Sequence, residues 1–429
     1  MALRFLHSGG NFYNSQGVSV PGIWSSTAGS SLSTSAPAGR ADTYAFEGEG
    51  IYNLGATYSG GILGGAFYIQ SAMAAEVLLA FNDASGNPQC DVRTTSVGTF
   101  QITRNGTVLG TSSVSVFFNS WFYLEFKALL STSLTGTCEV RLNGTVILTL
   151  TSQTNATTTA LFQFIRYGSN FGGSGATEYI RDMYGLDTTT GTQTSYLGDI
   201  NVQEFYPNGA GTNSAWSVFQ PSFALTAAAN TSGGTTVYTG TITDGGTNAY
   251  QGYYFSVSGF GNANNNGGPW LCTANTTTSI TLQNPNGVLQ TGATATCAFQ
   301  NPVQSGIHGG YADEGATTNV GTRPQADNIQ YIYSNTTNQL TDYAHTQIGT
   351  FTGTIQGVVH VTYARKDDAG TRQMAQITVE GSVVETGSTI TLGSTYQYYF
   401  DVLEVDPGTS SLWTESGFNS ATFGVKEVT

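Results

Sequence analysis

The stretch "CEVRLNGTVILTL", residues 138–150, alternates apolar and polar side chains on both sides of an Asn-Gly pair. Asn-Gly between two alternating runs is the strongest short-range signal for a β-hairpin. The stretch "TFQITRNGTVLGT", residues 99–111, repeats the pattern. Similar alternation recurs along most of the chain, in segments bounded by Gly, Asn, Asp, Ser or Thr, without any long stretch of helical periodicity. The sequence therefore predicts an all-β protein.

The composition agrees with this class and argues against two kinds of function. The chain has 429 residues, of which 39% are hydrophobic and 9% charged, with 55 glycines; this is enough apolar material for several cores joined by tight turns. A net charge of −14 without a basic patch argues against nucleic-acid binding. The first 30 residues lack the features of a Sec signal, and no apolar run is long enough for membrane insertion.

The four cysteines have neither metal-binding spacing nor the density of a disulfide framework. We expect them to be buried apolar residues. Two pairings stay open as alternatives, a Cys272–Cys297 bridge between neighbouring strands and a Cys90–Cys138 bridge.

The first 206 residues resemble a known family in the order of their segments: "TYAFEGEG", "CDVRTTSVGTFQITRNGTVLGTSS", "NSWFYLEFKALL", "GTCEVRLNGTVILTLT" and "YIRDMYGLDTTTG". This order is similar to that of the concanavalin A-like (LamG-type) β-sandwich of bacteriophage virion structural proteins. The stretch around Trp121 resembles the W-Y-x-I/L-E-F-K strand of that family. Asp182 to Asp187 resembles its closing strand, with Arg181 in place of the first acidic residue. The resemblance implies a jelly-roll sandwich over 1–206.

The C-terminal part extends the resemblance through "YADEGATTNVGTRPQADNIQYI", "VTYARKDDAGTRQMAQITVEG" and "LGSTYQYYFDVLEVDPGTSSLWTESGFNSATFGVKEV". These stretches are similar to the second β-domain of the same virion proteins, which implies a second jelly-roll-like sandwich. Residues 222–302 instead alternate Tyr, Ile and Phe with Thr and Ser in short strands, which predicts an inserted immunoglobulin-like module. We therefore predict domains at 1–206, at 207–221 together with 303–429, and at 222–302.

A charged segment around Asp367 and Asp368 separates two alternating runs. Aspartate followed by glycine favours a turn, so the sequence predicts that residues 355–364 and 375–380 form a hairpin. The alternative is a calcium site that uses Asp367 and Asp368 as metal ligands. Calcium takes about six to eight oxygen ligands, and only two carboxylates are local. Calcium is thus the one cofactor considered, and otherwise none is expected.

Catalytic motifs are missing from the sequence. The four histidines are scattered, and no nucleophile elbow, zinc-protease motif or phosphate-binding glycine loop is present. Glycoside hydrolases of the concanavalin-like fold need two carboxylates in one cleft, in one family as E-x-D-x-x-E. That motif is absent, and the pairs Glu47 and Glu49, and Asp313 and Glu314, have the wrong spacing. We therefore expect that the protein is not an enzyme.

Three loops have the composition of lectin sites: "NDASGNPQ" (82–89), "YGSNFGGSG" (167–175) and "GFGNANNNGGPW" (259–270). Lectin-like sandwiches hold glycans in shallow loops through aromatic faces and Asn or Asp side chains, in some cases ordered by calcium. The candidate glycan-binding residues are Asn82, Asp83, Asn170, Phe171, Asn264 and Trp270.

These patterns favour a non-enzymatic structural component of a phage virion, at the tail tip, in a fibre or as a capsid decoration, assembled in the host cytoplasm. The expected partners are other virion proteins and further copies of this chain, because such particles are symmetric. Host or environmental glycans are a further expected partner. The alternatives are a glycan-binding adhesin or receptor-binding protein and a polysaccharide-degrading enzyme.

Overall fold

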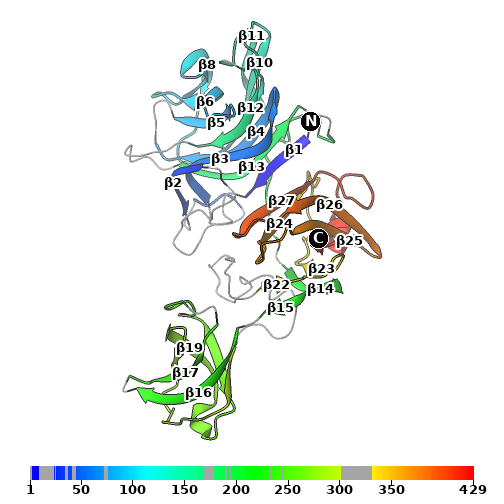
Figure 1. Ribbon diagram of the computed structural model, residues 1–429. Coiled ribbons are helices and arrows are strands. Elements are labelled where there is room, and N and C mark those ends of the chain that lie inside the picture. The colour runs from blue at the N-terminus through cyan, green and yellow to red at the C-terminus, as the bar shows by residue number, and fades with distance from the viewer. Residues whose placement is uncertain are drawn as a thin grey trace. The chain divides into compact units, whose positions relative to one another are not determined.

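The structure is a computed structural model. It describes all residues except 1, 9–23, 25, 34–36, 41–44, 72–75, 158, 169–177, 189–190, 194, 204, 206, 220, 232, 244–245 and 301–330. Among the described residues, strands dominate, and the helices are a 3-10 turn, η1 (Ala263–Asn265), and α2 (Glu415–Ser420). Neither helix has the length and apolar character that crossing a membrane requires. The predicted all-β class is confirmed (Figure 1).

The chain divides into two compact units. The first comprises Met1–Phe205 and Gln347–Phe423, and the second comprises Tyr206–Thr346 and Gly424–Thr429. This division groups residues differently from the three predicted domains, whose boundaries stay a prediction.

The N-terminal part of the first unit is one antiparallel sheet of 13 strands. The strands are β1 (Ala2–His7), β2 (Ser26–Ser33), β3 (Ala45–Tyr58), β4 (Gly60–Ile69), β5 (Val77–Asn82), β6 (Pro88–Thr94), β7 (Thr99–Arg104), β8 (Thr107–Ser115), β9 (Trp121–Leu129), β10 (Gly136–Leu142), β11 (Thr145–Gln153), β12 (Phe162–Tyr167) and β13 (Glu178–Asp187). Their order is β11-β10-β9-β4-β13-β3-β12-β5-β6-β7-β8, with β1 beside β13 and β2 beside β3.

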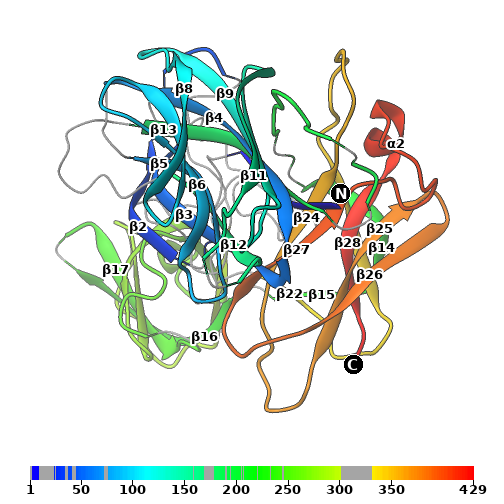
Figure 2. The ribbon, with the colours of Figure 1, turned by 90° about the horizontal axis from the view of Figure 1, so that it is seen from above.

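The two ends of this sheet, β11 and β8, come together, so that the sheet folds into the two layers of a jelly-roll sandwich. Figure 2, the view from above, shows β5 and β6 side by side in one layer. Both predicted Asn-Gly hairpins are confirmed, as β7–β8 and β10–β11. Asn105 and Asn143 have positive φ angles of 44° and 49°, which asparagine tolerates better than most residues.

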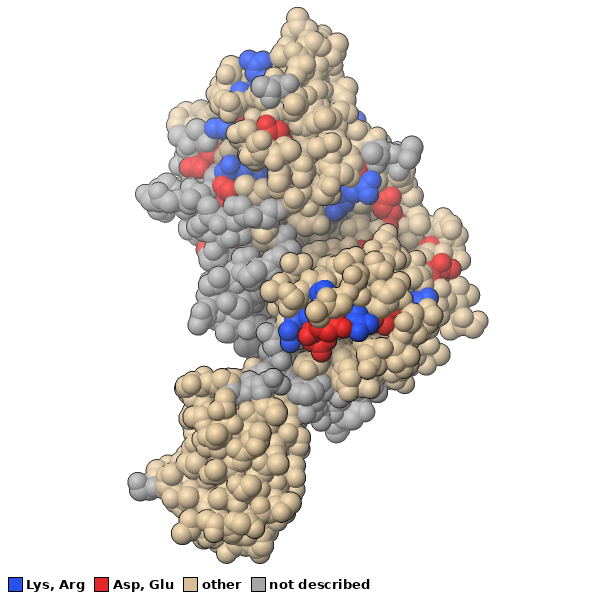
Figure 3. Space-filling view, viewed as in Figure 1, with Lys and Arg blue, Asp and Glu red and all other residues tan. Residues whose placement is uncertain are grey.

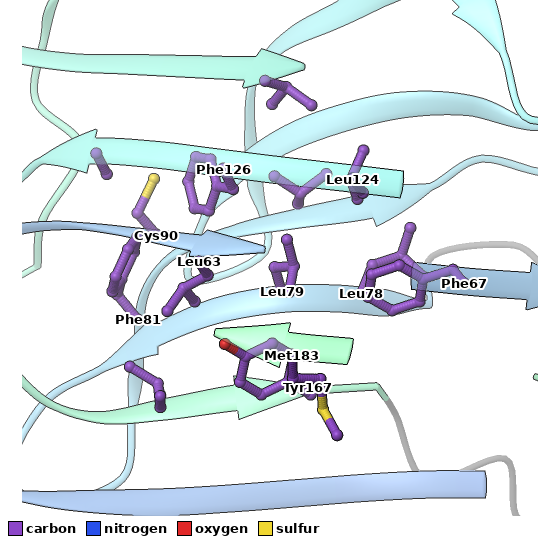
Figure 4. Packing of buried hydrophobic residues seen from close by; sticks show 14 of the residues in the cluster. Leu63, Phe67, Leu78, Leu79, Phe81, Cys90, Leu124, Phe126, Tyr167 and Met183 are labelled. Carbon is purple, nitrogen blue, oxygen red and sulfur yellow. The ribbon is translucent and has the colours of Figure 1, made fainter. Parts of the chain in front are cut away.

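Aromatic and aliphatic side chains fill the space between the layers (Figure 4). The ring of Phe81 on β5 lies 5.4 Å from that of Phe126 on β9 and 4.5 Å from that of Phe162 on β12. All three side chains are fully or almost fully buried. Burying a side chain of this size contributes about 1.5–3 kcal/mol, so this core is what holds the two layers together.

The remainder of the first unit holds β24 (Val358–Ala364), β25 (Gln373–Glu380), β26 (Val383–Thr391) and β27 (Gln397–Leu403). The predicted hairpin across residues 367–370 is wrong, because β24 pairs with β27 and β25 pairs with β26. The loop closes on itself instead. Arg372 forms an ion pair of 2.6 Å with Asp368, and Lys366 donates a hydrogen bond to the Gly370 carbonyl. Figure 3 shows acidic atoms flanked by basic ones on one face of the molecule.

Two carboxyl groups meet at the end of β25. A Cβ atom added at Gly408 would lie 2.4 Å from Glu380 Oε2 and 3.5 Å from Asp406 Oδ1. Asp406 is buried, and its Oδ1 accepts hydrogen bonds from the amides of Gly408 and Thr409. Burial raises the pKa of Glu380 to about 7, and the hydrogen bond and charge of Asp406 add to this effect.

From the contact of Glu380 with Asp406 we expect the stability of the first unit to depend on pH. The folded state holds the Glu380 proton more tightly than the unfolded chain, whose pKa is near 4.5. The resulting stabilisation is complete below pH 4.5 and is lost as the pH rises through about 7. The Glu380→Gln variant should therefore melt a few degrees above the parent at pH 8 and close to it at pH 5. An equal difference in unfolding midpoint between variant and parent at both pH values would contradict this prediction. Asp367→Asn, which changes an exposed carboxyl, serves as the control in the same thermal scans.

The second unit contains a closed barrel formed by β16 (Ser222–Thr231), β17 (Thr235–Thr241), β18 (Tyr254–Ser258), β19 (Gly267–Asn275), β20 (Ser279–Leu282) and β21 (Ala295–Phe299). The closed ring of strands distinguishes this module from the predicted immunoglobulin-like sandwich, in which two separate sheets pack face to face. Because β21 pairs with both β16 and β18, the strands close in the order β16-β17-β20-β19-β18-β21. Aromatic side chains of this module form a core of their own, which includes Phe223, Tyr238 and Phe255.

The rest of the second unit contains further strands outside the barrel, among them the end of a strand that lies beside β23 (Leu340–His345). β14 (Pro207–Ser214) pairs with β23, and β15 (Ser217–Phe219) pairs with β22 (Tyr331–Tyr333). β28 (Thr422–Glu427) follows α2 and ends in this unit. The stretch "YADEGATTNVGTRPQADNIQ", with Asp313 and Glu314, lies outside the described residues.

Candidate functional site

A shallow pocket of 440 Å³ opens on the outer face of the jelly-roll sheet. It is lined by Gly39, Arg40, Trp121, Phe122, Asn143, Asp199 and Asn201. Every one of these residues belongs to the first unit. They come from four separate stretches of the chain, which the folded sheet brings together.

The side chains of β9 alternate between the two faces of the sheet, and Trp121 on the outer face lines the pocket. Phe122 and the next even-numbered residues of the strand point into the core, whereas Trp121 and Tyr123 lie on the opposite face. The β10–β11 turn is fixed to this face, because Asn143 Oδ1 accepts a hydrogen bond of 2.7 Å from the Tyr123 amide. The Tyr123 hydroxyl donates to the Asp182 carbonyl at 2.9 Å. Strand and turn are therefore held in one register at the pocket.

The indole of Trp121 is partly exposed and held in one orientation. Its Nε1 donates a hydrogen bond of 3.0 Å to the Pro37 carbonyl, and its ring meets the Tyr68 ring edge-on at 5.6 Å. Gly39, with a φ of +121°, allows the chain to pass close to the indole, since an added Cβ would lie 3.1 Å from Trp121 Cδ1. The indole therefore contributes to the lining of the pocket in a fixed orientation.

Arg40 forms the charged wall of the pocket. Its guanidinium donates to Asp182 at 3.0 Å and to Asp199 at 2.7 Å, and it lies 5.6 Å from the centre of the Tyr123 ring. Burial raises the pKa of Asp182, against the opposing effect of a hydrogen bond from the Val202 amide. One cation therefore faces two carboxyl groups, and the wall carries no excess of positive charge.

A second polar cluster lies beneath the segment that contributes Asp199 and Asn201. The Tyr184 hydroxyl donates to Glu125, whose carboxylate also accepts a hydrogen bond of 2.8 Å from the Gly198 amide. Burial raises the pKa of both Glu125 and Tyr184. Buried carboxylates that accept hydrogen bonds from a neighbouring segment hold that segment in place. Glu125 and Tyr184 thus position the rim of the pocket.

None of the described residues predicted from loop composition lines this pocket. Asp83 accepts hydrogen bonds from the amides of Ser85 and Asn87 and so shapes its own turn, and Asn82 beside it is buried. In the barrel, Asn264 is exposed, and Trp270 is half-buried with its ring stacked 6.4 Å from that of Tyr238. Asn170 and Phe171 lie outside the described residues. Glycan binding by these residues stays a prediction.

The possible ligands of calcium are placed at the exposed loop after β24. Asp367 and Asp368 are both exposed, and the Arg372 guanidinium lowers the pKa of Asp368. Across the described part of the chain, no group of three or more His, Cys, Asp or Glu side chains is arranged to hold a metal ion. Calcium binding by Asp367 and Asp368 stays a prediction.

The pocket residues were not recognised from the sequence as a site. Trp121 and Asn143 stand within stretches whose pattern indicates a strand and a hairpin turn, so that a structural role accounts for them. Arg40, Asp199 and Asn201 stand in segments without a regular pattern. A tryptophan at the outward-facing end of an otherwise core-forming strand was the one signal that pointed to an exposed aromatic face.

No family model matches the chain, and no curated protein matches it. Solved structures of similar fold include an endo-β-1,4-glucuronan lyase from Trichoderma reesei, with 12% identity, coverage of 44% of this chain and 96% of that chain, and a TM-score of 0.33. A PL-14 alginate lyase from Aplysia kurodai has 12% identity, coverage of 44% and 100%, and a TM-score of 0.32. The carbohydrate-binding module CBM66 from Bacillus subtilis has 12% identity, coverage of 38% and 99%, and a TM-score of 0.25. At these values the likeness concerns the fold alone.

These matches bear on two predictions, the absence of enzymatic activity and the membership of a phage virion family. The expectation that the protein is not an enzyme is contradicted, because several solved structures of similar fold are named as polysaccharide lyases. That expectation rested on missing catalytic motifs, among them the carboxylate pair of glycoside hydrolases. The jelly-roll β-sandwich is confirmed, whereas membership of a LamG-type phage virion family stays a prediction.

Proposed function

We propose that the jelly-roll part of the first unit binds polysaccharide chains in the pocket formed by Arg40, Trp121, Asn143, Asp199 and Asn201. The observation that supports this best is the partly exposed indole of Trp121, fixed by its hydrogen bond to Pro37, in an open pocket of 440 Å³. Small-molecule sites typically span about 300–1,000 Å³ and combine aromatic walls with a few placed polar groups. The pocket has a volume in this range, and its lining combines Trp121 with a surface that is mostly polar.

The polar groups of the pocket suit a sugar ring stacked on the indole. The apolar C–H face of a pyranose packs on an aromatic ring, while its hydroxyl groups both donate and accept hydrogen bonds. Asp199 offers acceptor oxygens, and Asn201 offers an amide donor and a carbonyl acceptor at the exposed rim. Such groups bind adjacent hydroxyls on a sugar that lies on Trp121.

The charge of the pocket favours neutral sugars over acidic ones. The guanidinium of Arg40 is already paired with Asp182 and Asp199, so it has no unpaired charge to offer to a uronate. The net charge of the whole chain, −14, further disfavours approach of an anionic polymer at low salt. We therefore infer that a neutral polysaccharide is the preferred ligand class.

The proposal is tested by isothermal titration with a panel of neutral and uronate-containing oligosaccharides. We expect a neutral member to bind, and Trp121→Ala to weaken its binding at least tenfold, which corresponds to about 1.4 kcal/mol. Asp199→Ala should weaken it less, because one hydrogen-bond partner is lost. Phe117→Ala, at an aromatic side chain that is 60% exposed, is the matched control and should bind like the parent.

Two results would contradict the proposal. One is that no oligosaccharide of the panel binds, and the other is that Trp121→Ala and the parent bind equally well. The same incubations are analysed for newly formed chain ends, so that any turnover can be assigned to this pocket through its loss in Trp121→Ala.

A further inference from the structure

Two buried thiols meet in the core of the jelly roll, away from the pocket. Cys90 lies in β6 and Cys138 in β10, near opposite ends of the strand order, and their Sγ atoms are 3.5 Å apart. Both cysteines are free, with exposures of 0% and 2%. Figure 4 shows the Cys90 side chain among the core residues, close to Phe81. The folding of the sheet has thus placed two thiols 48 positions apart in sequence in direct contact.

We propose that Cys90 and Cys138 form a reversible disulfide that joins the two layers of the jelly roll when the protein meets a small oxidant. A disulfide bond is about 2.03–2.05 Å long, so the two sulfur atoms have to approach by about 1.5 Å. Rotation of both side chains about χ1 moves the sulfurs over distances of this size. Each thiol is already in hydrogen-bonding contact with the other, so no other side chain separates them.

The surroundings of the pair make the two thiols unequal. The Asn155 amide donates a hydrogen bond of 3.2 Å to Cys138 Sγ. The hydrogen bond from the Cys90 thiol lowers the pKa of Cys138, and Asn155 adds to this effect, while burial opposes it. The hydrogen bond to Cys138, followed by burial, raises the pKa of Cys90. Cys138 is therefore the thiol that ionises first, and the thiolate is the reactive form.

Hydrogen peroxide, which is small and uncharged, is an oxidant of the required class. The Cys138 thiolate attacks one peroxide oxygen, the O–O bond breaks, hydroxide leaves, and Cys138 becomes a sulfenic acid. The Cys90 sulfur then attacks the Cys138 sulfur, the S–O bond breaks, and the departing hydroxide leaves as water with the Cys90 proton. Two thiols are oxidised, and one peroxide is reduced to two water molecules.

The bond would restrict the unfolded chain more than the folded one. It closes a loop that runs through β7, β8 and β9 and links two strands of different layers. Cross-links of long loops stabilise mainly by removing conformations from the unfolded state. The barrel provides an internal comparison, because Cys272 and Cys297 are also buried and free, in strands separated by β18.

The test uses the full chain, reduced with dithiothreitol and then treated with hydrogen peroxide. We expect mass spectrometry of the digest to show one cross-linked peptide that contains Cys90 and Cys138. The midpoint of thermal unfolding should rise by about 5–10 °C, and dithiothreitol should reverse the rise. Cys90→Ala should lose both responses, and Cys272→Ala, the matched control in the barrel, should keep both.

The peptide map of the parent decides the matter even if Cys90→Ala fails to fold. The proposal is overturned if both thiols stay unlinked while glutathione in the same tube is oxidised, or if Cys272 and Cys297 become linked in their place. It is also overturned if the cross-link forms but lowers the unfolding midpoint, since the native fold would then have to distort to accept the bond.

Discussion

Replacing Phe81 by alanine is expected to lower the free energy of unfolding of the first unit by about 3–5 kcal/mol. The side chain is fully buried, and its ring lies between those of Phe126 and Phe162, which belong to strands on either side of the core. Its removal leaves a cavity at the contact that holds the two layers together. The loss comprises both the burial of the ring and the unfilled space.

Urea denaturation of the full chain, followed by tryptophan fluorescence, measures this loss. Phe117→Ala removes the same atoms from a side chain that is 60% exposed and should change the free energy by less than about 0.5 kcal/mol. A loss of less than about 1 kcal/mol in Phe81→Ala would mean that the two layers do not share this core.

Adding a single methyl group at Gly64 on β4 should cost about 2–3 kcal/mol. A Cβ atom there would lie 2.1 Å from Cε1 of the Tyr184 ring, well inside contact distance. Tyr184 is fully buried and its hydroxyl is hydrogen-bonded to Glu125, so the ring cannot swing aside without breaking that bond. Gly64→Ala should therefore be strongly destabilising, although it is chemically the smallest substitution.

The control for this variant is Gly349→Ala in the same unit. A Cβ at Gly349 meets no atom within 4 Å, so the methyl group has room. Thermal unfolding should place this control close to the parent and Gly64→Ala well below it. Equal unfolding midpoints for the two variants would show that Tyr184 does not pack against β4.

The sequence predicted those parts of the fold whose signals are local. The turns at Asn105 and Asn143 form as expected, because an Asn-Gly pair and its flanking alternation determine a hairpin within a dozen residues. The segment around Asp368 carried a similar signal and misled the prediction. Alternation indicates a strand but not its partner, and β24 pairs with β27, a strand more than thirty positions away.

The candidate pocket could not be predicted from the sequence, because its residues come from segments that are far apart in the chain. Trp121 and Asn143 lie on neighbouring parts of the sheet, and the segment before β3 and the segment after β13 bring Arg40 and Asp199 to the same place. Each residue alone has an ordinary structural explanation. In one of the loops with the composition of a lectin site, Asp83 accepts hydrogen bonds from amides of its own loop and so stabilises the turn.

The place of the protein in a phage virion stays a prediction that the sequence resemblance alone supports. The same holds for assembly with other virion proteins, for self-association and for calcium binding. Polysaccharide binding is compatible with a particle surface and does not depend on it. Enzymatic turnover is an open outcome of the binding experiments, and the pocket variants assign it if it occurs.

A crystal structure of the full chain with the tightest-binding neutral oligosaccharide tests the central claim most directly. The account predicts a sugar ring stacked on the indole of Trp121, with its hydroxyl groups within hydrogen-bonding distance of Asp199 or Asn201. A sugar bound elsewhere, for example beside Trp270 in the barrel, with the Trp121 pocket unoccupied, would contradict it.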